Sequence, residues 1–146
     1  MNLFGVIEIS SSALTAQRQR AEVVASNLAN AETTRTPAGG PYKRQHVVFG
    51  TRRPAVSAFS RILAGFGNRH ARGVRVERVV TDKTPPVTRF DPSHPDADAQ
   101  GYVSYPAINP IEEMANLTGA ARAYQLNVAA TQATKSMIVQ SLDILR

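Results

Sequence analysis

The sequence contains no cysteine and no tryptophan, and only 6% of its 146 residues are aromatic. The absence of cysteine excludes disulfides, thiolate metal sites and cysteine nucleophiles. With so few aromatic rings, a core must be built from small aliphatic side chains. No apolar run reaches the roughly 18 uncharged residues that a transmembrane helix needs, so we expect no membrane insertion. The first residues lack the basic start of a secretory signal, so export would need another route.

Positive charge is concentrated in the middle of the chain. The formal net charge is +6, and 12 of the 17 basic residues lie between Arg35 and Arg89, where the only acids are Glu77 and Asp82. Such a segment fits a solvated loop, a surface that meets an anionic partner, or a nucleic-acid footprint. Because no binding motif frames it, we expect no nucleic-acid partner. A basic nucleic-acid-binding module is the alternative function.

Apolar residues at the N-terminus recur at alternating spacings of four and three, the period of a helix with one apolar face. This N-terminal seam, which Ser10 and Gln17 interrupt, consists of Leu3, Ile7, Leu14, Ala21, Val24 and Leu28. Asn27 and Asn30, followed by Pro37, predict that the helix ends near residue 30.

A longer seam with the same spacing occupies the C-terminus, interrupted at Thr131 and Lys135. It consists of Met114, Leu117, Ala121, Tyr124, Val128, Ile138, Leu142 and Leu145. Asn109 is a suitable N-cap, Pro110 suits the first helical turn, and Glu112 and Glu113 favour a helix N-terminus. A helix from 111 to 145 is about 52 Å long at about 1.5 Å per residue. Since the rest of the chain cannot cover that length, the two helices pair with each other, with helices of neighbouring subunits, or both.

The segment between the helices is rich in strand and turn signals. Short strands are predicted at 46–49, 73–80, 88–90 and 102–105, and the doubled Val79-Val80 indicates a bulge. Gly50 to Arg72 has little periodicity and is expected to be a mobile arginine-rich loop. The predicted fold class is therefore α+β, with long amphipathic terminal helices packing as a coiled coil. The expected division is a helical arm at 1–34, a β-rich segment at 35–108 and a C-terminal helix at 109–146.

Candidate catalytic chemistry is sparse. His94 with Asp91, Asp96 and Asp98 could ligate a metal, but the spacing matches no standard site, and a proline-bounded turn explains the cluster better. No phosphate-binding glycine loop occurs. We therefore expect no enzyme activity, no metal and no cofactor.

Several short motifs, in order, resemble the bacterial flagellar rod and hook proteins, the proximal rod proteins in particular. They include SNLANA at 26–31, GGPYKRQ at 39–45, DPSHPDAD at 91–98 and NPIEEM at 109–114. Glu32 departs from the pattern, where a second asparagine is expected. The motif residues carried over are Asn27, Leu28, Asn30, Pro41, Tyr42, Asp91, Pro92, His94, Pro95, Asn109 and Pro110.

The resemblance implies a structural subunit of the basal-body rod, a hollow shaft that spans the periplasm and transmits torque. It implies export through the flagellar type III apparatus without a cleaved signal peptide. It also implies terminal helices that line an axial channel, with the β-rich segment facing outward. The implied neighbours are other copies of the chain and the rod proteins FlgB, FlgF and FlgG. On this interpretation the two helical seams are the assembly interface.

Overall fold

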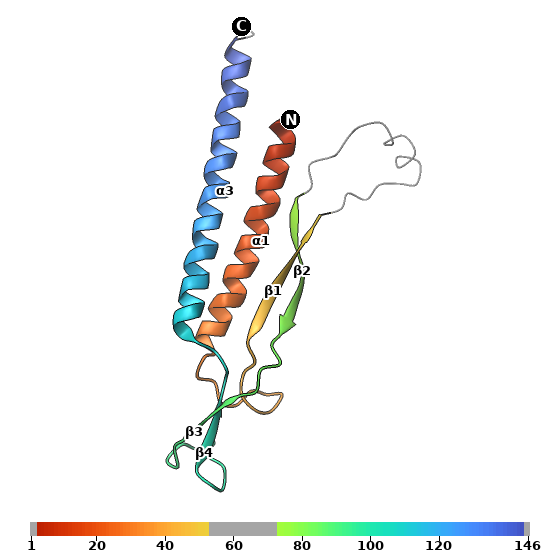
Figure 1. Cartoon of the computed structure of the whole chain (residues 1–146). Helices are drawn as coiled ribbons and strands as arrows, with labels where there is room; N and C mark the ends of the chain where they lie inside the picture. The colour runs from red at the N-terminus through yellow and green to blue at the C-terminus, as the bar shows by residue number, and fades with distance from the viewer. Residues whose placement is uncertain (1–2, 53–72, 145–146) are drawn as a thin grey trace, which may run out of the picture.

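The computed structural model describes residues 3–52 and 73–144, so most of the predicted arginine-rich loop lies outside the described residues. The described elements are α1 (Leu3–Ala29), β1 (Gln45–Thr51), β2 (Val74–Thr81), β3 (Val87–Phe90), β4 (Tyr102–Tyr105) and α3 (Pro110–Ile144). In Figure 1, α1 and α3 run antiparallel, and α1 lies between α3 and the β1–β2 pair. The β3–β4 pair lies beyond the end of the helix pair where α3 begins. The α+β fold with two long terminal helices is confirmed.

The helix ends follow from local hydrogen bonds. The Asn109 side chain accepts a hydrogen bond from the Ile111 N–H at 3.1 Å, so Asn109 is the N-cap of α3, as predicted. At the other junction the Asn30 side chain donates to the Ser26 carbonyl at 2.9 Å and satisfies one of the last carbonyls of α1. α3 has 35 residues and α1 has 27, so α3 extends past the N-terminus of α1 by the length of about two turns.

The strands form two separate antiparallel pairs, β1 with β2 and β3 with β4. In the first pair Val48 faces Arg78 and Phe49 faces Val76, so Glu77 is the extra residue of a bulge. The sequence predicted an irregularity in this strand but placed it at Val79-Val80. Gly50, which faces Arg75, leaves space for the bulged residue: a Cβ there would lie 2.9 Å from the Glu77 carboxylate.

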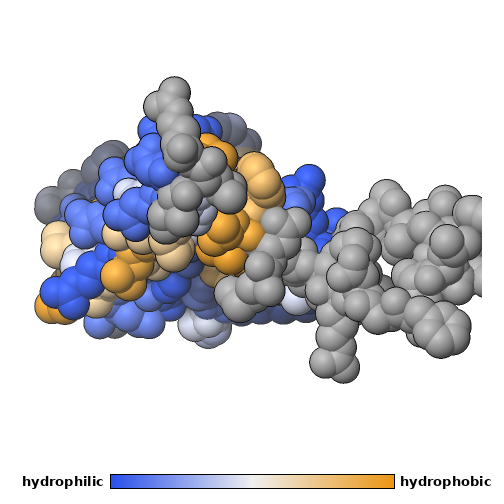
Figure 2. Space-filling view, turned by 90° about the horizontal axis from the view of Figure 1, so that it is seen from above, coloured by the Kyte–Doolittle hydropathy of each residue, from blue (hydrophilic) through white to orange (hydrophobic). Residues whose placement is uncertain are grey.

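Fully buried apolar side chains are few and small. Among the described residues they are Ala16, Val24, Val103 and Ala120. Pro106 is buried as well, and the buried polar side chains are Ser10, Asn27, Glu113 and Thr134. Seen down the helix pair in Figure 2, apolar residues reach the surface at several places among polar ones. The subunit alone therefore buries little of its large apolar surface.

Candidate assembly surface

The predicted seam residues are partly buried on α1 and more exposed on α3. On α1, Val24 is buried. The other five seam residues are partly buried, namely Leu3, Ile7, Leu14, Ala21 and Leu28. On α3, three seam residues are partly buried, namely Leu117, Val128 and Ile138. Four others are exposed, namely Met114, Ala121, Tyr124 and Leu142. Leu145 lies outside the described residues.

Helical geometry places both seams on one side of the helix pair. The contacts of Arg44 with Glu112 and Glu113 mark the side of α3 that faces the strands. At about 100° per residue, Met114, Ala121 and Val128 project from the opposite side of α3. On α1 the Ser12 hydroxyl accepts a hydrogen bond from the Val74 N–H of β2, and at about 100° per residue Ile7 and Leu14 project away from that strand side as well. We call this common surface, which Val139 extends, the seam face.

Apart from Val24, the closest contact between α1 and α3 uses residues outside the seams. It is lined by Ser10, Val24 and Asn27 on α1 and by Glu113, Ala120 and Thr134 on α3, all of them buried. Small side chains let two helices approach closely. The large aliphatic residues of the seams lie beside this contact, where only part of their surface is covered.

A buried polar cluster joins the two helices to the start of β1. The Asn27 amide nitrogen donates to the Gln45 carbonyl at 2.8 Å and to Glu113 Oε2 at 2.9 Å. Its oxygen accepts from the Gln45 N–H at 2.9 Å and from the Tyr42 hydroxyl at 3.2 Å. Asn27 is 1% exposed, and all its hydrogen-bonding capacity is used. The Asn27 amide thus bonds both the N–H and the carbonyl of Gln45, as the backbone of a neighbouring strand would.

Arg44 completes this cluster, which we call the base network (Asn27, Tyr42, Arg44 and Glu113). Its guanidinium donates to the carboxylate of Glu113, which is 1% exposed, and to Glu112 at 3.3 Å. Burial by itself raises the pKa of Glu113, but the hydrogen bond from Asn27 and the ion pair with Arg44 outweigh it and leave that pKa below its usual value. The network therefore holds a buried carboxylate in its charged form.

This depressed pKa predicts acid sensitivity. A carboxylate with a lower pKa in the folded state stabilises the fold fully above the ordinary glutamate pKa, about 4.3, and that contribution is lost as the pH falls through the folded-state value. Glu113→Gln should therefore flatten the loss of unfolding free energy on acidification, measured by urea unfolding at several pH values. Hydrogen bonds from Thr84 lower the pKa of Asp82 to about 2. Asp82 therefore makes the same contribution to the acid sensitivity of both proteins. Parallel pH profiles would contradict the assignment.

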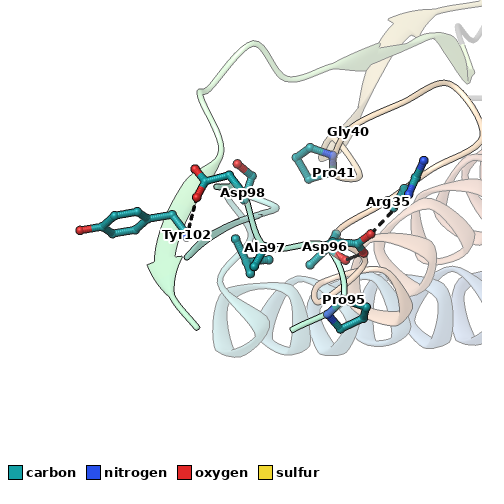
Figure 3. Close-up of a pocket in the computed structure, with 11 residues that line it drawn as sticks. Arg35, Gly40, Pro41, Pro95, Asp96, Ala97, Asp98 and Tyr102 are labelled. Atoms are coloured by element: carbon teal, nitrogen blue, oxygen red, sulfur yellow. Dashed lines mark hydrogen bonds and ion pairs between the residues drawn. The ribbon is translucent and has the colours of Figure 1, made fainter. Parts of the chain in front are cut away.

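Two further motif residues, Pro41 and Pro95, line a cavity of about 430 Å³. Asp96 accepts a hydrogen bond from the Thr34 hydroxyl at 2.8 Å and pairs with Arg35 at 3.6 Å. Figure 3 shows Pro41 and Pro95 on the cavity wall, with Arg35 directed at Asp96. Thr34 and Asp96, which are 62 residues apart in sequence, thus join the segment that follows α1 to the turn at 91–98.

The turn at 91–98 is built by its own side chains, as predicted. Asp91 accepts hydrogen bonds from the Ser93 N–H at 3.2 Å and the Ser93 hydroxyl at 2.7 Å. The His94 ring accepts from the Asp96 N–H at 3.1 Å and lies edge-on to Tyr105.

Within the described ranges no group of three or more acidic, His or Cys side chains is placed to hold a metal ion. No described helix is long and apolar enough to cross a membrane.

Part of the basic segment's charge is used inside the subunit. Arg44 belongs to the base network, Arg35 pairs with Asp96, and Arg52 lies 3.9 Å from Glu8. Lys43, Arg75, Arg78, Lys83 and Arg89 are exposed. Those residues remain open to an anionic partner.

The base network was not predicted. The sequence assigned Glu113 to the helix dipole and Asn27 to a helix end, since neither signal shows that residues 86 positions apart form a hydrogen bond. One signal was available: Asn27 lies between Val24 and Leu28, a position where a polar side chain requires a buried partner.

Both ends of the chain match family models of flagellar proteins. A model described as "Flagella basal body rod protein" matches residues 7–35, which contain most of α1. One described as "Flagellar basal body rod FlgEFG protein C-terminal" matches residues 99–144, which contain β4 and α3.

Whole proteins match over the full length. The flagellar basal-body rod protein FlgC of Borreliella burgdorferi is 40% identical over 100% of this chain and 99% of its own length. FlgC of Bacillus subtilis is 39% identical and FlgC of Salmonella typhimurium 37%, each over 99% of this chain and at least 98% of the relative. The chain belongs to the FlgC family. It is a structural subunit of the flagellar basal-body rod, as the motifs predicted, and the nucleic-acid alternative is set aside.

Proposed function

We propose that this rod subunit occupies the proximal rod and assembles through its terminal helices into a hollow shaft that transmits torque. The observation that carries the proposal is the large apolar surface left uncovered on α3. Met114, Tyr124 and Leu142 remain exposed, although they belong to the predicted assembly interface. Neighbouring subunits would cover this surface in the rod.

Shared burial explains how such a shaft resists twisting. Each methylene buried between subunits contributes about 0.8 kcal/mol. A face formed by two helices offers many such groups along its length, so the load is distributed over many contacts. The seam residues on both helices, and the side of the pair that they share, are therefore the proposed assembly interface.

The proposed neighbours are other copies of the chain together with FlgB, FlgF and FlgG. Export through the flagellar type III apparatus without a cleaved signal, into a rod that spans the periplasm, is part of the same proposal. Its support is the membership of the FlgC family and the motif resemblance. We propose that the chain is divided into an assembly core, formed by the helical parts at 1–34 and 109–146, and a β-rich segment at 35–108. Within the core, α1 ends at Ala29 and α3 begins at Pro110.

A clean deletion in the native host tests the proposal. We expect non-motile cells whose basal bodies, imaged by electron cryotomography, keep their inner rings but lack the rod. Complementation with the intact gene should restore both motility and the rod. Motile deletion cells with complete rods would refute the proposed role.

A further inference from the structure

α3 carries a second apolar surface that the seam spacing did not include. It consists of Leu126, Ala130, Ala133 and Met137, at spacings of four, three and four, and all four are exposed. Leu126 is 71% exposed. We call these residues the back strip. It is continuous with the α1 contact, because Ala123 and Asn127 beside it are already partly buried.

The back strip and the seam face lie on opposite flanks of α3. At about 100° per residue, the side of α3 turned away from α1 lies between them. That side is exposed and mostly polar, with Thr118, Arg122, Gln125, Gln132, Ser136 and Gln140, and it also carries the exposed residues Ile111, Ala115 and Ala129. In the stretch 123–142 the only charged residue is Lys135. Two flanks of α3 are thus apolar, whereas its outer side is suited to water.

We infer that the seam face of one copy packs against the back strip of the next copy. This inference rests on the proposed function. The two surfaces differ in side-chain size: the seam face presents the large side chains Met114 and Tyr124, and the back strip has the small residues Ala130 and Ala133 between Leu126 and Met137. Ridges of large residues fit where small residues leave grooves. Neither surface carries a cluster of like charges that would oppose the contact.

The contact is heterologous, because each copy uses two different surfaces. A heterologous contact does not end with a pair: it repeats into a ring or an open helix. A closed two-fold dimer would require both surfaces of one copy to meet both surfaces of its partner at once, which surfaces on opposite flanks of one helix cannot do. The placement of the two flanks on either side of the polar side of α3 therefore suits the repeating arrangement of a shaft.

Cysteine crosslinking tests this contact cleanly, because the natural chain has no cysteine. Cells would co-produce one tagged copy with Tyr124→Cys and a differently tagged copy with Leu126→Cys. Isolated basal bodies would be treated with a short bismaleimide. We expect a crosslinked dimer containing both tags in the mixed sample, and its loss when either variant is produced alone. Arg78→Cys, on an exposed strand residue, replaces Leu126→Cys in the matched control.

Incorporation of the tagged chains into basal bodies is measured first, which separates the two proposals. Absence of the tagged but otherwise unsubstituted chain from basal bodies would refute the proposed role in the rod. Chains present without a mixed-tag dimer would refute only the contact between copies. Dimers from one variant alone, or products that contain a different rod protein in place of the second copy, would also refute it.

Discussion

Leu142→Asp is expected to abolish motility while leaving the subunit folded. Leu142 lies near the C-terminal end of α3, which extends past α1, and its side chain is 62% exposed in the subunit. An exposed substitution should change the free energy of unfolding by no more than about 0.5 kcal/mol. In the assembled rod the same carboxylate would be buried without a partner, which is strongly unfavourable. Motility in soft agar and rod content of isolated basal bodies measure the effect.

Gln140→Asp is the matched control. It places the same charge two residues away, on the exposed polar side of α3, and should leave motility intact. Aspartate at Leu28 or Ile138 should also block assembly, but both are partly buried in the subunit, so it would disturb folding as well. Normal swimming of the Leu142→Asp strain, with rods present, would exclude this part of the seam face from the interface.

Arg44→Met should cost the subunit much of its stability. The arginine side chain is 15% exposed and that of Glu113 is 2% exposed, so removal of the guanidinium leaves a buried carboxylate with only hydrogen bonds for compensation. Breaking a buried ion pair in this way costs about 3–5 kcal/mol, a large share of the roughly 5–15 kcal/mol that stabilises a typical domain. Urea unfolding of the purified subunit measures the loss.

The pH dependence distinguishes this mechanism from a general packing defect. Without Arg44, only the hydrogen bonds from Asn27 and Asn116 oppose the effect of burial, so the pKa of Glu113 should rise and the variant should lose less stability on acidification than the intact protein. The intact protein should lose stability over the same range. Lys43→Met, a change at an exposed neighbour with no ion pair, should match the intact protein. A variant that is destabilised equally at all pH values would point to lost packing alone.

The local structure of this chain was largely predictable because its signals are local. Apolar spacing predicted a helix from 111 to 145, and α3 spans Pro110–Ile144. Asn109 caps it as its side chain predicts. The four strands lie where the alternating and β-branched segments placed them, within one to two residues. Periodicity and capping act within a few residues of the chain, so one sequence is enough to find them.

The partner of each helix face was not predictable in the same way. Large aliphatic residues at three- and four-residue spacing indicate an apolar face, but they do not say whether it packs within the subunit or between subunits. The closest helix contact uses small and polar residues, such as Ala120 and Thr134, which carry a weak signal. The back strip was missed because Ala130 and Ala133 add little hydrophobicity to a spacing pattern.

The base network also joins segments that are far apart in the sequence, which bears on the order in which the subunit folds. Asn27 hydrogen-bonds to Glu113, 86 residues later, and Arg44 pairs with the same carboxylate across 69 residues. A chain synthesised from its N-terminus presents α1 and β1 before the residue that joins them exists. Contacts of such wide sequence separation form late and slow folding. Until the segment that contains Glu113 emerges, the chain lacks the contact that joins α1, β1 and α3.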